Sequence, residues 1–371
     1  MSCPSASQCV AVGNYDVADQ GDVDGAGLLL TGSGGSWTAS QAPLPANAEP
    51  GDANAALSGV SCPSVSQCVA VGTYSDTAGN TQGLVVTGSD ASWTAEETPL
   101  PANAGDSPGT YVAQPFAVSC PSASQCVAVG EYKDGQGSWQ GLLLTLSNGS
   151  WTAAEAPLPD NALGSTDFLT GVSCPSAAQC VAVGEYGAGG AGVDGMLLTD
   201  TDGSWTAVPA PLPANNAEAG NTVSAVSCPS VSQCVAVGNY GPSTNGQMGL
   251  LLTDSGGSWT VAEAPLAADG ANGGEAPVPA VSCGAVSQCV AGGIYYSTSG
   301  GDYEQGLLLT DSDGSWSAAP APLPANAQTI DGTVTQASVN GASCSSAAQC
   351  VAVGNYAATS GSGGLLLTWA D

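Results

Sequence analysis

The sequence predicts an all-β fold, a seven-bladed β-propeller with four antiparallel strands and one internal disulfide in each blade. The segment SCPSASQCVAVGNY at residues 2–15 returns in related form, so that seven repeats start near residues 2, 61, 119, 173, 227, 282 and 343. The first cysteines of successive repeats are about 57 residues apart, which is in the range of propeller blades. Four short strands per repeat, with no helical periodicity, complete the pattern.

Residues 167–209 show the order of elements within one repeat. DFLTGVSC is a first β segment, CPSAAQC a tight turn and CVAVGEY a second strand that alternates at period two. After the loop GAGGAGVDG, a third strand MLLT, the turn DTDGS and a fourth strand SWTAVPA follow. A Pro-rich connector, APLPANNAEAGN, leads to the next repeat. We call these strands A to D, and we expect residues 1–371 to form a single propeller domain, with an open solenoid of β units as the alternative.

The fourteen cysteines occur two per repeat and six positions apart, an even number and uniform spacing that predict disulfides. The alternative is metal binding, but thiolate metal sites usually have closer cysteine pairs and often histidine, and the chain contains no histidine. Each pair would clamp the hairpin of strands A and B. The expected pairs are Cys3–Cys9, Cys62–Cys68, Cys120–Cys126, Cys174–Cys180, Cys228–Cys234, Cys283–Cys289 and Cys344–Cys350.

The charge balance excludes several partners. The formal net charge is −30, yet acidic residues number only 31, because Lys and Arg together number one. Nucleic-acid binding requires cations to neutralise phosphates, so we expect no nucleic-acid partner. No apolar run has the length of a membrane helix, so we expect no membrane insertion. Disulfides form in oxidising compartments, which predicts an acidic protein located outside the cell or on its surface.

The pattern VSCPS-x-x-QCVAVG, followed by LLLT, GSW-T and P-L-P, resembles the cysteine-paired tandem repeats of secreted actinobacterial proteins with a propeller-like fold. The resemblance covers nearly the whole chain and implies secretion and fold rather than an activity. The turns TDTDGSW at 199 and TDSDGSW at 310 also resemble, more weakly, the Asp-box of sialidase-type propellers. That motif marks a fold and is not catalytic.

The loops between strands B and C and between D and the next A vary among repeats, and variable loops on a rigid scaffold usually carry binding. A tyrosine ends strand B in every repeat: Tyr15, Tyr74, Tyr132, Tyr186, Tyr240, Tyr295 and Tyr356. Such rings could stack on sugars, although packing between blades is the simpler interpretation. Trp139 lies outside the repeat pattern, in the loop GQGSWQG, and is a stronger candidate for a contact residue. We therefore predict a ligand site containing Trp139, Tyr132 and Tyr186.

Two sets of carboxylates complete the candidate residues. Glu131 and Glu185 occupy matching positions in neighbouring repeats, and such a pair could act as acid and base on a glycosidic bond or could be solvated loop acids. Asp16, Asp19, Asp22 and Asp24 lie in the glycine-containing segment 16–25. Clustered carboxylates of this kind can hold calcium, although a solvated acidic loop is the alternative. We expect no other cofactor.

Three function classes remain. Without histidine there is no Ser-His triad, so catalysis would be limited to a glycoside hydrolase that uses carboxylates alone. A structural or adhesive scaffold that binds extracellular proteins is the second class. The interpretation we favour is a non-catalytic extracellular binding module, with a glycan or an extracellular protein as its partner.

Overall fold

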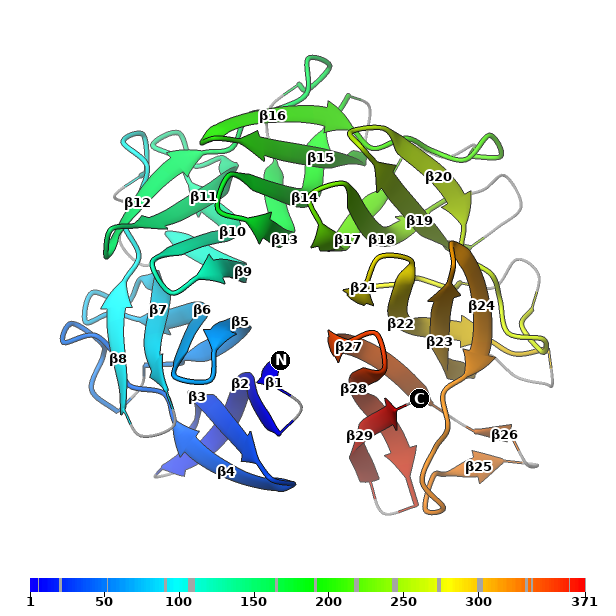
Figure 1. The fold of residues 1–371 in the computed structure, drawn as a ribbon. Helices are drawn as coiled ribbons and strands as arrows, with labels where there is room; N and C mark the ends of the chain where they lie inside the picture. Colours follow the sequence, from blue (N-terminus) through cyan, green and yellow to red (C-terminus); the bar gives the residue numbers. More distant parts are fainter. Residues whose placement is uncertain are drawn as a thin grey trace. The chain divides into compact units, whose positions relative to one another are not determined.

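The structure is a computed structural model, and it describes all residues except 6, 20–21, 52, 90–91, 106–110, 164–165, 190–191, 217–219, 242–245, 272–274, 299–302, 331–332, 335, 360 and 371. The described residues form strands and connecting segments without a helix (Figure 1). Six sheets have four strands, in chain order from A to D, and a seventh has three. The predicted class, an all-β fold of seven propeller blades, is therefore confirmed. The three-stranded seventh blade matches its repeat, which lacks an SWT segment.

The chain divides into two compact units, each described by itself. The first contains Met1–Gly187 with Leu198–Val208. Its first two sheets are β1 (Ser2–Ser5), β2 (Gln8–Asp19), β3 (Asp22–Ser33) and β4 (Ser36–Gln41), then β5 (Ala56–Ser64), β6 (Gln67–Ser75), β7 (Thr81–Ser89) and β8 (Ser92–Glu97). The third sheet has β9 (Ala113–Ser122), β10 (Gln125–Lys133), β11 (Trp139–Ser147) and β12 (Ser150–Glu155). The fourth has β13 (Asp167–Ser176), β14 (Gln179–Gly187), β15 (Val193–Thr201) and β16 (Ser204–Pro209), with β15 and β16 crossing the boundary of the unit.

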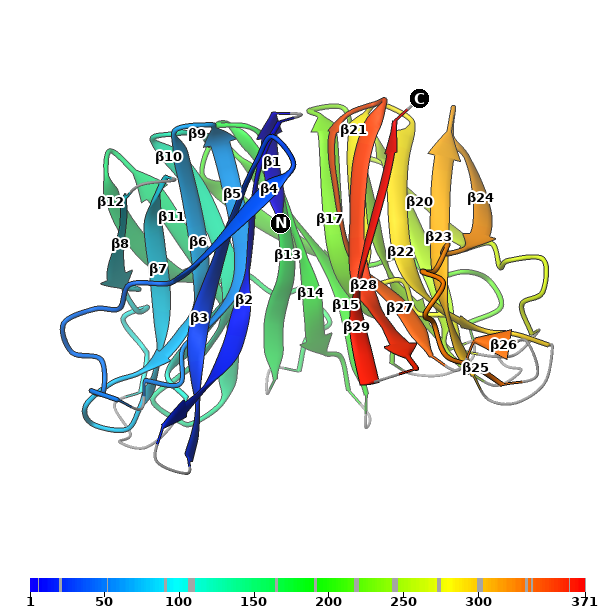
Figure 2. The ribbon, with the colours of Figure 1, turned by 90° about the horizontal axis from the view of Figure 1, so that it is seen from below.

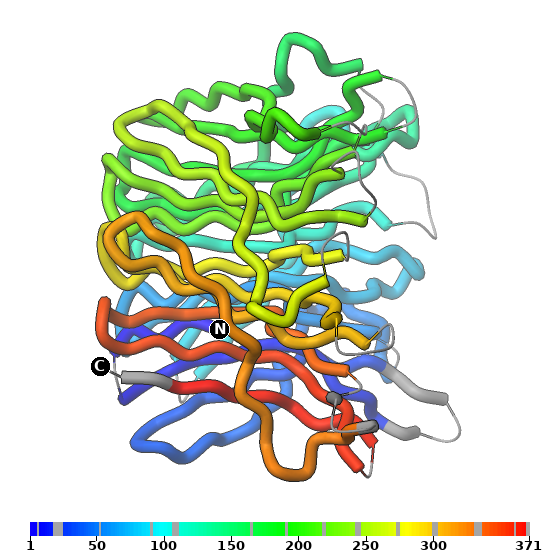
Figure 3. The backbone as a smooth tube through the Cα atoms, turned by 90° about the vertical axis from the view of Figure 1, so that its right-hand side faces the viewer, coloured from blue at the N-terminus to red at the C-terminus, as the bar shows by residue number. Residues whose placement is uncertain are grey.

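The second unit contains Ala188–Leu197 with Pro209–Asp371. Its sheets are β17 (Thr222–Ser230), β18 (Gln233–Tyr240), β19 (Met248–Ser255) and β20 (Trp259–Glu263), then β21 (Ala280–Ala285), β22 (Gln288–Tyr296), β23 (Glu304–Ser312) and β24 (Ser315–Pro320). The last blade has β27 (Ala337–Ser346), β28 (Gln349–Ala358) and β29 (Gly361–Ala370). The connector after β24, orange in Figure 3, includes the ribbon β25 (Thr329–Ile330) and β26 (Thr333–Val334).

Small residues in strand B allow blades to pack on both of its faces. In β10, five consecutive residues from Cys126 to Gly130 are buried, whereas in the outer strand β12 only Trp151 and Ala153, on one face, are partly buried. Side chains of β10 and β11, including Ala128 and Leu144, pack with Val71 of the preceding blade in one apolar cluster. The core therefore lies between blades, which explains why the B strands contain Val and Ala on both faces.

The repeated glycine of CVAVG is required by a close backbone approach. A Cβ atom on Gly130 would lie 2.0 Å from the carbonyl oxygen of Gln114 in strand A. The ladder between β9 and β10 shifts register at this point, between Val129 and Gly130. Any other residue would push the two strands apart, so the glycine belongs to the fold and not to a site.

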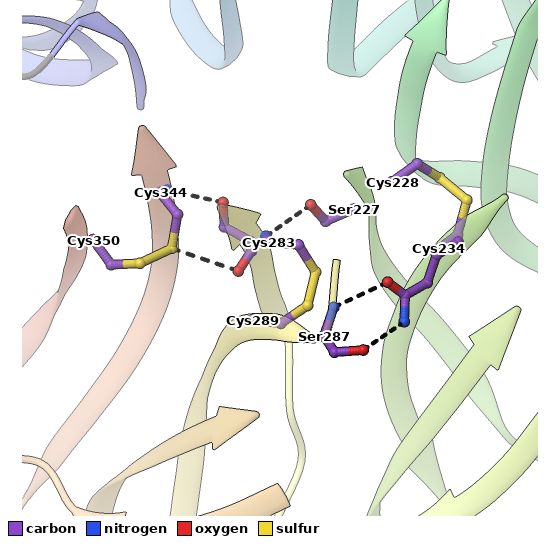
Figure 4. Close-up of a disulfide and its surroundings, with 10 residues drawn as sticks. Ser227, Cys228, Cys234, Cys283, Ser287, Cys289, Cys344 and Cys350 are labelled. Atoms are coloured by element: carbon purple, nitrogen blue, oxygen red, sulfur yellow. Dashed lines mark hydrogen bonds between the residues drawn. A yellow bond between two sulfur atoms is a disulfide. The ribbon is translucent and has the colours of Figure 1, made fainter. Parts of the chain in front are cut away.

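Within each unit, residues of the cysteine motif join neighbouring blades. All seven predicted disulfides are present. Figure 4 shows, in addition, that the Cys283 amide donates to Ser227 Oγ at 3.0 Å. The amide of Ser287 donates to Gln233 Oε1 at 3.0 Å, again across two blades. The cysteine–serine bond also links Cys62 to Ser2, Cys120 to Ser61, Cys174 to Ser119 and Cys344 to Ser282.

Candidate functional site

The tyrosines that end strand B are mostly structural. Tyr132 is fully buried, and its hydroxyl lies 2.8 Å from Asn103 Oδ1 and 3.0 Å from Glu155 Oε2. Burial is the main cause that raises the pKa of Tyr132. Tyr186 is also fully buried and donates to Asn161 Oδ1 at 3.0 Å. Both rings therefore lie in the interior, with an asparagine of the Pro-rich connector bonded to each hydroxyl, and their role as ligand contacts stays a prediction.

The same arrangement recurs along the chain. Tyr74 and Tyr356 bond to Asn47 and Asn326, and Tyr295 bonds to an aspartate, Asp269. Tyr15 differs, because 37% of its surface is exposed. The PAN segment of the connector thus fixes the B–C end of the blade, and a repeated polar contact explains the repeated tyrosine.

Glu131 and Glu185 are half-buried carboxylates in strands β10 and β14. Burial raises the pKa of each to about 7. Glu131 accepts a hydrogen bond from Gln114 Nε2 at 3.1 Å. Their ladder partners in strand A are Gln114 and Phe168, so each glutamate lies beside the inner strand of its own blade. The expectation of two fully solvated loop acids does not hold, and their role in acid–base chemistry stays a prediction.

The acidic segment 16–25 is mostly extended strand, where the sequence predicted a loop. Strands β2 and β3 continue through it, with Asp16 paired to Gly25, Val17 to Asp24 and Asp19 to Asp22 (Figure 2). The side chain of Asp16 is exposed, while those of Asp19, Asp22 and Asp24 lie outside the described residues. In the described part of the chain, no three acidic or cysteine side chains are placed to hold a metal ion. The calcium site stays a prediction.

The B–C loop of the third blade is rigidly built around Asp134. Its Oδ1 accepts from the amides of Gln136 and Ser138, each at 2.9 Å, and its Oδ2 accepts from Gln140 Nε2 at 3.1 Å. These bonds, led by that from Ser138, lower the pKa of Asp134. The carboxylate organises the turn, so the next residue after Ser138, Trp139, is held at the start of β11.

Three side chains meet at this loop, and we call Tyr111, Lys133 and Trp139 the aromatic platform. The Lys133 Nζ lies 5.4 Å from the centroid of the Trp139 ring, a cation–π contact. The Tyr111 ring centroid lies 6.4 Å from that of Trp139, with the planes tilted by 53°. Tyr111 is 54% exposed, and Trp139 is partly exposed. The platform therefore presents two aromatic rings and an ammonium group to solvent.

Backbone contacts position the platform. Lys133 and Trp139 are cross-strand partners in the β10–β11 ladder, so their side chains share a face. Tyr111 precedes Val112, whose amide donates to the Thr81 carbonyl and whose carbonyl accepts from the Lys133 amide.

Asp167, the first residue of β13, is buried and accepts a hydrogen bond from the Gly141 amide at 2.9 Å. Burial raises the pKa of Asp167 to about 6.

Lys133 is the single cation of the chain, and no carboxylate among the described residues forms an ion pair with it. An ammonium group that is left unpaired in a chain with 31 acidic residues keeps its hydrogen-bond donors for another partner. The sequence analysis identified Trp139 but missed Tyr111 and Lys133. Two signals were available: Tyr111 lies outside the repeated tyrosine position, and Lys133 directly follows a repeated tyrosine.

Comparisons with known proteins do not assign the chain to a family. No family model matches the chain, and no curated protein matches it. The Hadza microbial sialidase Hz136 is 9% identical, with a TM-score of 0.51, over 93% of this chain and 73% of that one. AofleA from Arthrobotrys oligospora is 11% identical, with a TM-score of 0.43, over 84% of this chain and 82% of its own. Trypanosoma rangeli sialidase is 12% identical, with a TM-score of 0.45, over 90% of this chain but only 56% of its own.

These identities bear on fold alone, and the resemblance to actinobacterial repeats stays a prediction. The disulfides indicate the compartment in which the protein folds. Seven disulfides indicate an oxidising, extracellular environment. A search of the described residues finds no helix that is long and apolar enough to cross a membrane.

Proposed function

We propose that this protein is an extracellular, non-catalytic binding module that recognises a glycan through the aromatic platform. The platform is the observation that carries the proposal. Exposed aromatic rings stack on the apolar faces of sugar rings, and an unpaired ammonium group donates hydrogen bonds to hydroxyl groups. The Hadza microbial sialidase, whose fold the chain shares, acts on a sugar according to its name, which is consistent with this class of ligand.

The net charge of the chain indicates which class of glycan to expect. With a net charge of −30, the protein repels polyanions over the range of the Debye length, and one lysine offsets little of that field. We therefore expect a neutral glycan rather than a sulfated or polyuronic one. The ligand would stack on Tyr111 and the exposed part of Trp139, with its hydroxyl groups near Lys133 Nζ.

The test is a glycan array with the oxidised protein, compared with the variant Trp139→Ala. Trp37→Ala is the matched control. Trp37 is 44% exposed and belongs to β4 of the first blade, whereas the platform belongs to the third blade. Saturable binding to related neutral glycans that Trp139→Ala abolishes, and Trp37→Ala preserves, supports the proposal. A blank array, or equal binding by all three proteins, contradicts it and favours the scaffold that binds extracellular proteins. Repeating the array with a chelator tests the calcium prediction for Asp16, Asp19, Asp22 and Asp24.

One observation favours a second candidate, a glycoside hydrolase that uses carboxylates alone. Glu131 and Glu185 have a pKa of about 7, the range in which a carboxylic acid can donate a proton at neutral pH. Incubation with the glycans that bind, followed by analysis of released sugars, separates the two functions. Hydrolysis that is lost in Glu131→Gln, with binding retained, would replace the binding module by an enzyme.

A further inference from the structure

A groove between the third and fourth blades lies at the end of the blades that carries the A–B and C–D turns. Its volume is about 400 Å³, which is in the range of sites for small ligands. All the residues that line it belong to the first unit. Strands β10, β11 and β12 contribute one side, and the fourth blade contributes Cys180, Asp200 and Trp205. We call this cavity the Asp200 groove.

The carboxylate of Asp200 is buried and only partly satisfied. Asp200 is 6% exposed, and its Oδ1 has no hydrogen-bond partner among the described residues. Burial raises the pKa of Asp200, and a hydrogen bond from the Gly203 backbone partly offsets this effect. The C–D turn therefore uses part of the carboxylate and leaves one oxygen without a donor. A nearby cation would stabilise the charged form of such a group.

The chain itself supplies no cation to this groove. Its single cation, Lys133, pairs with Trp139 at one end of the β10–β11 ladder, whereas the groove is lined by Cys126 and Leu146 near the other end. Asp202, which is exposed, adds a second acidic residue to the groove. Because the net charge of the chain is −30, charge complementarity favours a cationic ligand from outside.

The other lining residues favour an organic cation over a metal ion. Trp205 is partly exposed, and the face of an indole ring attracts ammonium groups. Leu143 and Ala154 give the side formed by the third blade an apolar surface that suits an alkyl chain. In the described part of the chain, no third acidic or cysteine side chain joins Asp200 and Asp202 to complete a set of metal ligands.

The preceding blades provide an internal comparison. A groove of about 430 Å³ between the second and third blades is lined by Trp151 and Leu146. Leu146 and Asp200 each follow the threonine of their C strand, in β11 and β15, so they occupy equivalent positions. Asp254 and Asp311 occupy this position in the next two blades. The fold therefore accepts either leucine or aspartate here, and the two grooves differ in this carboxylate.

We propose that the Asp200 groove binds a primary ammonium group carried on an alkyl stem. The ammonium group lies beside the Asp200 carboxylate and the Trp205 ring, and the stem lies along Leu143. A small alkylamine and the lysine side chain of another protein share this chemistry. The site is at the opposite end of the third blade from the aromatic platform and does not depend on the proposed glycan function.

The test is isothermal titration of the full, oxidised chain at pH 7 with n-pentylammonium. n-Pentanol is the matched neutral ligand, because it keeps the alkyl stem and lacks the charge. The test variants are Asp200→Asn, which keeps the size of the side chain, and Asp200→Leu, which installs the residue found at the equivalent position of the third blade. Asp160→Asn is the control, because it removes one acidic charge at an exposed position of a connector.

We expect one n-pentylammonium per chain, no binding of n-pentanol, and affinity about tenfold or more weaker in both Asp200 variants, as when a desolvated charge pair is broken. Asp160→Asn should bind as the wild type does. Circular dichroism and thermal unfolding check that the variants are folded. Absence of saturable binding, affinity that neither Asp200 variant changes, or equally tight binding of n-pentanol overturns the proposal.

A second titration, with the peptide acetyl-Ala-Lys-Ala-amide, distinguishes the two sources of the ammonium group. Peptide binding that is tighter than that of n-pentylammonium, and that Asp200→Asn weakens, supports the proposal with a lysine side chain of another protein as the ligand. Binding of n-pentylammonium without binding of the peptide supports it with a small alkylamine as the ligand. Peptide binding that both Asp200 variants retain, with no binding of n-pentylammonium, overturns it.

Discussion

The amide of Cys174 donates a hydrogen bond to the Ser119 hydroxyl at 3.0 Å, and this bond joins the innermost strands of two neighbouring blades. Where this bond is described, the cysteine motif has two separate roles. The disulfide closes the hairpin within a blade, and the serine before the cysteine accepts the amide of the following blade. Both roles explain why the segment recurs in the chain, and each can be tested independently.

Ser119→Ala removes the acceptor of this bond. We expect a loss of about 1 kcal/mol of stability, because the amide of Cys174 is left without its partner at a half-buried position. Ser124→Ala is the matched control, since Ser124 is exposed in the A–B turn. Thermal unfolding of the oxidised proteins is the measurement, and equal midpoints for the two variants would contradict the proposed role of the serine.

The double variant Cys174→Ser with Cys180→Ser removes one clamp without leaving a free thiol. The sequence separation of six gives a small loop, for which loop-closure entropy predicts a loss of about 2 kcal/mol. We expect the protein to remain folded, with a lower unfolding midpoint, because six other disulfides and the blade core remain. If the midpoint is unchanged in oxidised protein, the clamp contributes nothing at this blade.

Much of the fold could be predicted from the sequence because the same strand, turn and cysteine patterns recur in seven repeats. The period-two pattern of CVAVGEY and the turn Asp202-Gly203, in which both residues have positive φ, correspond to a strand and a tight hairpin turn. The cysteine spacing gave the disulfides. A feature of most blades, such as the Tyr132 contact with Asn103, was visible in the sequence as a repeated tyrosine, but the buried position of that tyrosine was not.

The candidate site was harder to predict because it depends on residues outside the repeat. Trp139 was identified as an exception, yet nothing in the sequence places Tyr111, 28 positions earlier, beside it. The hydrogen bond from the Lys133 amide to the Val112 carbonyl brings the connector beside the end of β10, and this is a tertiary contact. The segment 16–25 was misread as a loop because its aspartates and glycines are typical of turns, whereas the ladder of β2 and β3 overrides that preference.

The raised pKa values of Glu131 and Glu185 predict a pH dependence of stability. A carboxylic acid with a folded-state pKa of about 7 and an unfolded value near 4.5 binds more protons in the folded state between these values. Stability therefore falls as pH rises from about 4.5 to 7, and the loss is complete above pH 7. Allowing for solvent screening, each glutamate contributes about 1 kcal/mol to this loss.

The measurement is the unfolding midpoint at pH 5 and pH 8 for the wild type and for Glu131→Gln with Glu185→Gln. We expect the double variant to lose less stability between the two pH values, because glutamine mimics the protonated form at both. Glu96→Gln is the matched control, because Glu96 is an exposed residue of β8. A pH difference that is the same in the double variant and the wild type would show that other groups cause it.

The aromatic platform predicts a separation between affinity and stability. For a glycan identified on the array, Trp139→Ala should abolish measurable binding, because the ring that contacts both Tyr111 and Lys133 is removed. Lys133→Met keeps the apolar stem and should weaken binding about tenfold, as expected when a charged hydrogen-bond donor is lost. Lys133→Arg retains the charge and should restore most of the affinity.

Tyr132→Phe provides the converse case at the neighbouring residue. Its hydroxyl serves Asn103 and Glu155 in the interior, so its loss should reduce stability by about 1 kcal/mol and leave glycan affinity unchanged. Isothermal titration and thermal unfolding on the same four variants give the two readouts. If Tyr132→Phe weakens binding as strongly as Lys133→Met, the ligand contacts a different surface, and the platform formed by Tyr111, Lys133 and Trp139 is not the site.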